Sequence, residues 1–154
     1  MLIPAWASVV ALHGVDPGGP QLVISLLILV SVADSGAYFA GRHWGRVKLA
    51  PAISPGKTRE GVYGALAGSV IFALLLAWFR PETGHPALLV LLCLAVTLIS
   101  VAGDLFESLL KRQAGVKDSG KLLPGHGGVL DRIDSLTAAA PLYLLGLLHL
   151  GLQP

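Results

Sequence analysis

Four long runs of apolar residues constrain this chain more than any other feature of its sequence. They cover about Gln21 to Ala40, Val62 to Phe79, Pro86 to Ala102 and Leu136 to Leu152. Each has about the 17–25 residues that a helix needs to cross the roughly 30 Å hydrocarbon core of a bilayer. A segment inside a bilayer must satisfy its own backbone hydrogen bonds, and no run alternates like a barrel strand. The sequence therefore predicts an all-α, polytopic integral membrane protein with about four transmembrane helices.

The charged residues are few and gathered in two places. They make up 13% of the 154 residues, against roughly 25% in an average soluble domain. Ten of the 11 Lys and Arg residues fall in two long connections: Arg42, Arg46, Lys48, Lys57 and Arg59 in the first, and Lys111, Arg112, Lys117, Lys121 and Arg132 in the second. Two spans separate these connections, so both lie on one face, which the positive-inside rule makes cytoplasmic.

The start of the chain differs from the rest. Residues 1–20 form an apolar segment without Lys or Arg, so they lack the positive region of a secretory signal. We expect either a short interfacial segment or the interior of a longer parent protein. Residues 21–154 are expected to form one membrane domain, in which the single cysteine, Cys93, is a packing residue.

Several ionisable residues lie close to the apolar runs, where charge is costly and often functional. Asp34 lies inside the first run and would either line a substrate cavity or make a structural ion pair. If the third helix continues past the membrane edge, Asp104, Glu107, Ser108 and Lys111 share one face through their spacing of three and four. That face indicates either a polar site or an amphipathic helix exit.

A second polar stretch precedes the fourth apolar run. Asp131 and Asp134 are three residues apart at a helix start, so both carboxylates can face one point and suit a hard cation such as Mg²⁺. Either residue could instead cap the helix, because Asp is favoured there. His126, between glycines, could contact phosphate, carry a proton or pack the loop.

Two blocks of residues closely resemble the signature of the phosphatidate cytidylyltransferase family. The first is Ala33-Asp34-Ser35-Gly36-Ala37-Tyr38-Phe39-Ala40-Gly41-Arg42, followed by Ile53-Ser54-Pro55 and Lys57-Thr58-Arg59-Glu60-Gly61. The second is Ser108-Leu109-Leu110-Lys111-Arg112, Lys117-Asp118, Leu123-Pro124-Gly125-His126-Gly127-Gly128 and Asp131-Arg132-Ile133-Asp134. The resemblance covers about Val32 to Leu136. Family members are commonly nearly twice as long, so the chain resembles their C-terminal half, and they usually carry a basic residue where Gly56 stands.

The resemblance implies a membrane enzyme that converts CTP and phosphatidate into CDP-diacylglycerol and diphosphate, in the inner membrane of a bacterium with its site facing the cytoplasm. It implies a divalent cation, Mg²⁺ alone or with a second cation, held by Asp104, Asp131 and Asp134, and it adds Lys111 as a catalytic residue. The substrate-binding residues it implies are Asp34, Ser54, Lys57, Arg59, Ser108, Arg112, Lys117, Asp118, His126 and Arg132. The partners expected are CTP, phosphatidate, the lipid bilayer and a second copy of the chain, with no nucleic acid.

Three other functions stay open at this point. The chain could be a catalytically incomplete piece or a partner subunit of a full-length synthase, because it is short. It could be a transporter with Asp34 and Asp104 in its path, although polar loops on one face only argue against alternating access. It could also be a different CTP-using lipid enzyme. For Arg42, Arg46 and Lys48, anchoring at the membrane surface is the favoured interpretation.

Overall fold

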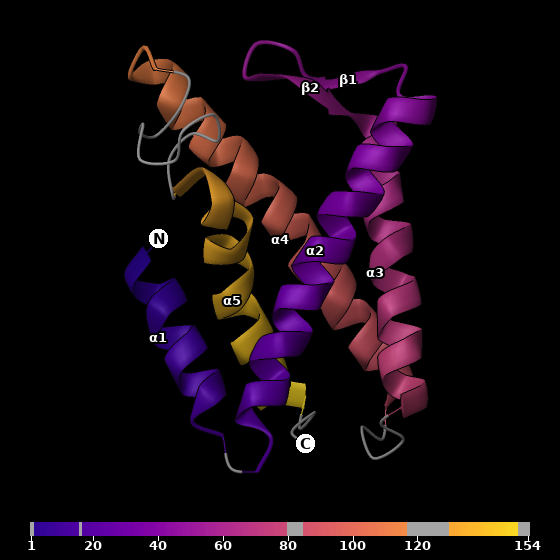
Figure 1. Cartoon of the computed structure of the whole chain (residues 1–154), viewed down its shortest axis with the longest axis vertical. Coiled ribbons are helices and arrows are strands. Elements are labelled where there is room, and N and C mark those ends of the chain that lie inside the picture. The colour runs from indigo at the N-terminus through magenta and orange to yellow at the C-terminus, as the bar shows by residue number, and fades with distance from the viewer. Residues whose placement is uncertain (1, 16, 80–84, 117–129, 151–154) are drawn as a thin grey trace.

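The chain folds as a bundle of helices with a small hairpin at one end (Figure 1). The computed structural model describes residues 2–15, 17–79, 85–116 and 130–150, and only the backbone of residues 130–132 and 150. In chain order the helices are α1 (Leu2–His13), α2 (Gly19–Trp44), α3 (Arg59–Phe79), α4 (Pro86–Gln113) and α5 (Leu130–Leu150). The hairpin, between α2 and α3, consists of β1 (Lys48–Ala50) and β2 (Ser54–Thr58).

The helices confirm the predicted all-helical, multi-pass membrane fold. Within the described residues, α2, α3 and α4 are each long and apolar enough to cross a membrane. The apolar part of α5, Ile133–His149, and α1 are shorter apolar helices. The predicted count of four spans is therefore approximate.

Two helices run further than the apolar runs suggested. The helix predicted to end near Ala40 continues to Trp44, and the one predicted to end near Ala102 continues to Gln113. Proline stands in the first turn of both helices. Backbone N–H groups in a first turn have no acceptor within the helix, so the missing N–H of proline costs no hydrogen bond there. These extensions carry polar residues beyond the apolar part of the bundle.

The apolar core lies in the half of the bundle away from the hairpin. Leu12 of α1, Leu26 and Leu29 of α2, Leu89 of α4 and Tyr143 of α5 are all at most 1% exposed. Helix α2 packs mainly on α3, and α4 on α5, while α1 lies against α5 and α2. The large apolar side chains that remain exposed on the outside of the bundle suit a lipid environment.

The hairpin was not predicted, because the sequence indicated only a long connection between two apolar runs there. Lys48 pairs with Thr58 and Ala50 with Ser54 in an antiparallel ladder. Its base is fixed to α3, since the Val47 carbonyl accepts from the Arg59 N–H at 2.9 Å. Thr58 then caps α3, because its Oγ1 accepts from the Gly61 N–H at 3.1 Å. The hairpin is thus held where the polar ends of the helices gather.

Candidate active site

A cavity of about 860 Å³ opens at the hairpin end of the bundle. Every element except α1 contributes to it. Its polar lining residues are Asp34, Tyr38, Arg42, Lys57, Thr58, Asp104, Lys111, Asp134 and Ser135. Residues from four helices and the hairpin therefore meet here, although they are as much as a hundred positions apart in the chain.

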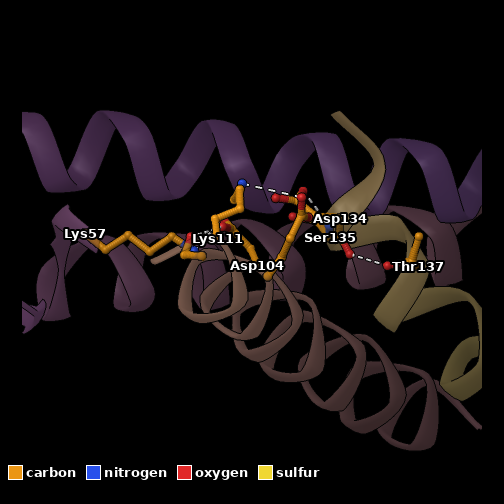
Figure 2. A network of polar contacts seen from close by, with 8 residues as sticks. Lys57, Asp104, Lys111, Asp134, Ser135 and Thr137 are labelled. Atoms are coloured by element: carbon orange, nitrogen blue, oxygen red, sulfur yellow. Dashed lines mark hydrogen bonds and ion pairs between the residues drawn. The ribbon is translucent and has the colours of Figure 1, made fainter. Parts of the chain in front are cut away.

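Lys57 and Asp104 form the clearest polar contact in the cavity. The Lys57 ammonium group pairs with the Asp104 carboxylate, so the hairpin is tied to α4 across the cavity (Figure 2). Ser108, one turn further along α4, donates from its hydroxyl to the same carboxylate at 3.4 Å. Both members of the pair keep about a quarter of their side-chain surface exposed, at 26% and 29%, so the pair is accessible to a ligand that enters the cavity.

Asp134 faces the cavity from α5. Its Oδ1 accepts from the Ser135 N–H at 2.7 Å, and its carbonyl accepts from the Thr137 hydroxyl at 2.8 Å (Figure 2). Because α5 begins at Leu130, Asp134 lies inside the helix and is not its N-cap. Its carboxylate interacts electrostatically with Asp104. Two carboxylates from different helices thus share one region of the cavity.

Glu107 and Lys111 lie beside these carboxylates on α4. Their charged groups are 3.4 Å apart, and both side chains are largely buried, with 11% and 16% of their surface exposed. Glu107 also interacts with Asp134. Burial of an acidic cluster is costly without neutralising charge, so Lys111 offsets part of the negative potential on this side of the cavity.

Asp34 completes the acidic lining from α2. It interacts electrostatically with Asp104 and Asp134, which repel its charge, and with Lys57, which attracts it. Of the two roles considered from the sequence, the position agrees with the cavity lining. The described carboxylates Asp34, Asp104 and Asp134 and the ammonium groups of Lys57 and Lys111 therefore surround one space.

Some predicted site residues lie away from the cavity lining. Ser54 begins β2, and Arg59 is the exposed first residue of α3. Arg112 donates from Nε to the Ile53 carbonyl at 3.4 Å, so it tethers the hairpin to α4. Lys117, Asp118 and His126 lie outside the described residues, and so do the side chains of Asp131 and Arg132.

Five polar residues with a place in or beside the cavity were not among the predicted site residues. Tyr38, Arg42, Thr58 and Ser135 line the cavity, and Glu107 interacts with two residues that do. The sequence alone favours anchoring at the membrane surface for Arg42. The signal that could have found Arg42 is its spacing of four from Tyr38 and of eight from Asp34, which puts all three on neighbouring faces of one helix.

The chemistry of the acidic residues fits a hard divalent cation. Mg²⁺ is commonly held by one or two carboxylates together with substrate phosphates, and Asp104 and Asp134 offer two carboxylates that interact with each other. No three His, Cys, Asp or Glu side chains in the described part of the chain are grouped closely enough to hold a metal ion by themselves. The third predicted ligand, Asp131, lies one turn before Asp134, and its side chain is not described.

Comparison with known proteins gives consistent relatives. The chain is 52% identical over 144 residues to the phosphatidate cytidylyltransferase of Pseudomonas aeruginosa, covering 93% of this chain and 53% of that protein. It is 50% identical over 151 residues to the enzyme of that name in Haemophilus influenzae, covering 92% and 52%. For the one in Staphylococcus epidermidis the identity is 42% over 124 residues, covering 80% and 48%. The chain thus spans about half the length of these curated relatives.

A solved structure supports the fold. An intramembrane enzyme for archaeal membrane lipid biosynthesis aligns with a TM-score of 0.61 over 79% of this chain and 75% of its own, at 24% identity. The model of the cytidylyltransferase family matches residues 1–149, nearly the whole chain. Together with the signature residues that line the cavity, this match shows that the chain belongs to the cytidylyltransferase family.

Proposed function

We propose that this chain transfers the cytidylyl group of CTP to phosphatidate. An oxygen of the phosphatidate phosphate forms a bond to the α-phosphorus of CTP, the bond from that phosphorus to the bridging oxygen of the β-phosphate breaks, and diphosphate leaves. The product is CDP-diacylglycerol. The site would face the cytoplasm at the inner membrane of a bacterium, since the two basic connections lie on that face by the positive-inside rule.

One observation carries this proposal. Carboxylates and ammonium groups from four separate elements surround one cavity at the end of membrane-spanning helices, in a chain about half identical to phosphatidate cytidylyltransferases. The position suits the substrates, because a nucleotide arrives from water whereas a phospholipid arrives within the leaflet. Several residues of the family signature line this cavity, among them Asp34, Lys57, Lys111 and Asp134.

The proposed reaction requires charge neutralisation more than it requires proton transfer. A phosphate monoester is already ionised near neutral pH, so it needs no strong base to act as a nucleophile. The protein must hold two anionic groups in line and stabilise the charge that builds up on the departing diphosphate. Lys57 and Lys111, which both line the cavity, are suited to contact phosphate oxygens as point charges.

Asp104 and Asp134 would hold the cation, with Asp131 as the predicted third ligand. A bound divalent cation would neutralise charge on the CTP phosphates and on the leaving group. The ammonium group of Lys57 pairs with the Asp104 carboxylate, which supports a role for this carboxylate in holding positive charge. When CTP arrives with its cation, Lys57 would exchange the carboxylate for a phosphate.

The decisive experiment is a turnover assay with the chain purified in detergent. CTP-dependent conversion of phosphatidate to CDP-diacylglycerol should occur with Mg²⁺ and should stop when the metal is chelated. Metal-dependent product would establish that this chain is a complete catalytic unit. Absence of product from protein with an intact thermal unfolding transition would reject the proposal for this chain by itself.

A second candidate follows from the length of the relatives. Because the chain spans only about half of each, it could be a part of a synthase that acts only with additional helices. In that case the purified chain would bind CTP and metal without turnover. Activity would appear after it is combined with the N-terminal half of a relative.

A further inference from the structure

A second hollow lies on the outside of the bundle between α2 and α3. It is an apolar groove of about 510 Å³ lined by Ile24, Leu27, Ile28, Ser31, Val32, Ser35, Gly36 and Gly68. Ile24, Leu27 and Ile28 are about half exposed. Side chains of this kind on a membrane-spanning helix face hydrocarbon, so the groove opens to the acyl chains of the bilayer.

Two glycines line the groove where α2 and α3 come close together. At Gly36 a Cβ atom would lie 2.6 Å from the Gly64 carbonyl oxygen, so α2 and α3 touch through their backbones here. Small residues permit such close helix contacts in membranes. At Gly68 a Cβ atom would lie 3.1 Å from a Val32 methyl group. Gly36 and Gly68 therefore let α2 and α3 approach each other closely beside the groove, because a side chain at either position would collide with the other helix.

The groove leads to the cavity along one face of α2. Ile24, Ile28, Ser31 and Ser35 are spaced by three or four residues, and the same spacing continues to Tyr38 and Arg42. Tyr38 and Arg42 also line the cavity. These two residues therefore stand where the apolar groove and the polar cavity meet.

Tyr38 and Arg42 are already arranged as a pair. The Arg42 Nη1 donates to the Tyr38 hydroxyl at 2.6 Å, and the guanidinium carbon lies 5.9 Å from the centre of the tyrosine ring. Both side chains are exposed, so the remaining guanidinium donors are accessible to a ligand. A guanidinium offers a fork of donors that matches two oxygens of a phosphate.

We propose that Arg42 and Tyr38 form the subsite for the phosphate of the lipid substrate, with an acyl chain of that lipid lying in the groove between α2 and α3. This inference rests on the proposed function and refines it. Phosphatidate would be held from the α2 side, and CTP from the side of the hairpin and α4, where Lys57, Asp104 and Lys111 lie. The two anions would then meet between these sides, near Asp34.

Binding measurements can test this subsite whether or not the chain turns over. Dioctanoyl phosphatidate, dioctanoylglycerol and CTP with Mg²⁺ are titrated separately into the detergent-solubilised chain. Arg42→Ala should weaken phosphatidate binding by roughly tenfold or more, the effect of a hydrogen bond to a charged group. CTP binding should change less than about twofold, and Arg42→Lys should retain part of the phosphatidate affinity. Dioctanoylglycerol, without the phosphate, should bind wild type and Arg42→Ala alike.

Arg46→Ala is the matched control, because Arg46 is exposed near the same end of α2 but does not line the cavity. It should leave all three affinities unchanged. Ser31→Phe tests the groove separately: it should weaken binding of a long-chain phosphatidate and spare a dibutyryl one. Unchanged phosphatidate binding in Arg42→Ala would overturn the subsite, and so would an equal loss for CTP and phosphatidate. Failure of the enzymatic proposal would appear differently, as binding without turnover in wild type.

Discussion

The two ends of the helix bundle differ in the side chains that line their interior. Away from the hairpin, leucines of four helices surround Tyr143 in a closely packed apolar core. At the hairpin end, Asp104, Lys57 and Asp134 surround an open cavity (Figure 2). The first region is closely packed, whereas the second contains a cavity. The difference teaches that substitutions at the hairpin end can remove chemistry while the other end keeps the chain folded.

The largest expected effect is the loss of a carboxylate at the cavity. Asp104→Asn or Asp134→Asn keeps the size of the side chain but removes the charge that would hold the cation. Since a metal ion contributes several kcal/mol to such a transition state, we expect turnover to fall on the order of 100-fold or more. Asp131→Ala should abolish activity as well, and the thermal unfolding transition should stay within a few degrees of wild type in all three.

If these variants unfold, the hairpin end is needed for folding as well as for activity, and the proposed difference between the two ends is wrong. A matched loss of activity and of the unfolding transition would mean that the cavity carboxylates hold the fold together. Retained turnover in Asp131→Ala would instead remove that residue from the predicted ligand set, while leaving Asp104 and Asp134 to be judged by their own variants.

A second prediction concerns the close contact between α2 and α3 at Gly36 and Gly64. Gly36→Val places a branched side chain where a Cβ atom alone would lie 2.6 Å from the Gly64 carbonyl oxygen. Relief of this overlap must separate α2 from α3, which we expect to lower the free energy of unfolding by about 1–3 kcal/mol. Denaturation in detergent would measure it. The matched control is Gly56→Ala, because a Cβ atom at Gly56 meets nothing within 4 Å. Equal stability of the two variants would show that the glycine contact is not needed.

The apolar region was predictable from the sequence, and so were the acidic residues. Long apolar runs leave helix as the only structure for a spanning segment, and α2, α3, α4 and α5 follow those runs. Asp34, Asp104 and Asp134 were singled out because charge near hydrocarbon is costly, and the structure brings all three to the cavity. Their roles as ligands remain predictions.

The hairpin and the pair of Tyr38 and Arg42 were not predictable in the same way. Strands of three and five residues that contain Pro55 and Gly56 show neither alternation nor strand propensity. A basic residue after a span is explained by the positive-inside rule, so the spacing of Arg42 from Asp34 and Tyr38 did not by itself mark it as part of a site. Its position became clear only because α2 continues through Trp44.

A third prediction concerns the ion pair between Lys57 and Asp104 in the cavity. Lys57→Met removes the ammonium group that pairs with Asp104 and keeps most of the side-chain volume. If Lys57 moves to a phosphate when CTP binds, the KM for CTP should rise about tenfold, with little change for phosphatidate. Lys48→Met is the matched control, because Lys48 is on the same hairpin but does not line the cavity. An equal effect of both variants would point to general loss of positive charge.

The smallest expected effect tests the apolar end. The hydroxyl groups of Ser25 and Tyr143 are 2.7 Å apart, which joins α2 to α5 by a polar contact within the core. Tyr143→Phe removes that bond and retains the ring, so the free energy of unfolding should fall by about 1 kcal/mol. Because Tyr143 lies in the half of the bundle opposite the cavity, turnover and both KM values should stay within about twofold of wild type. Denaturation curves and the turnover assay, measured on one preparation, check both expectations. A large loss of activity at unchanged stability would contradict this separation of roles. It would mean that the core positions the cavity residues as well as stabilising the fold.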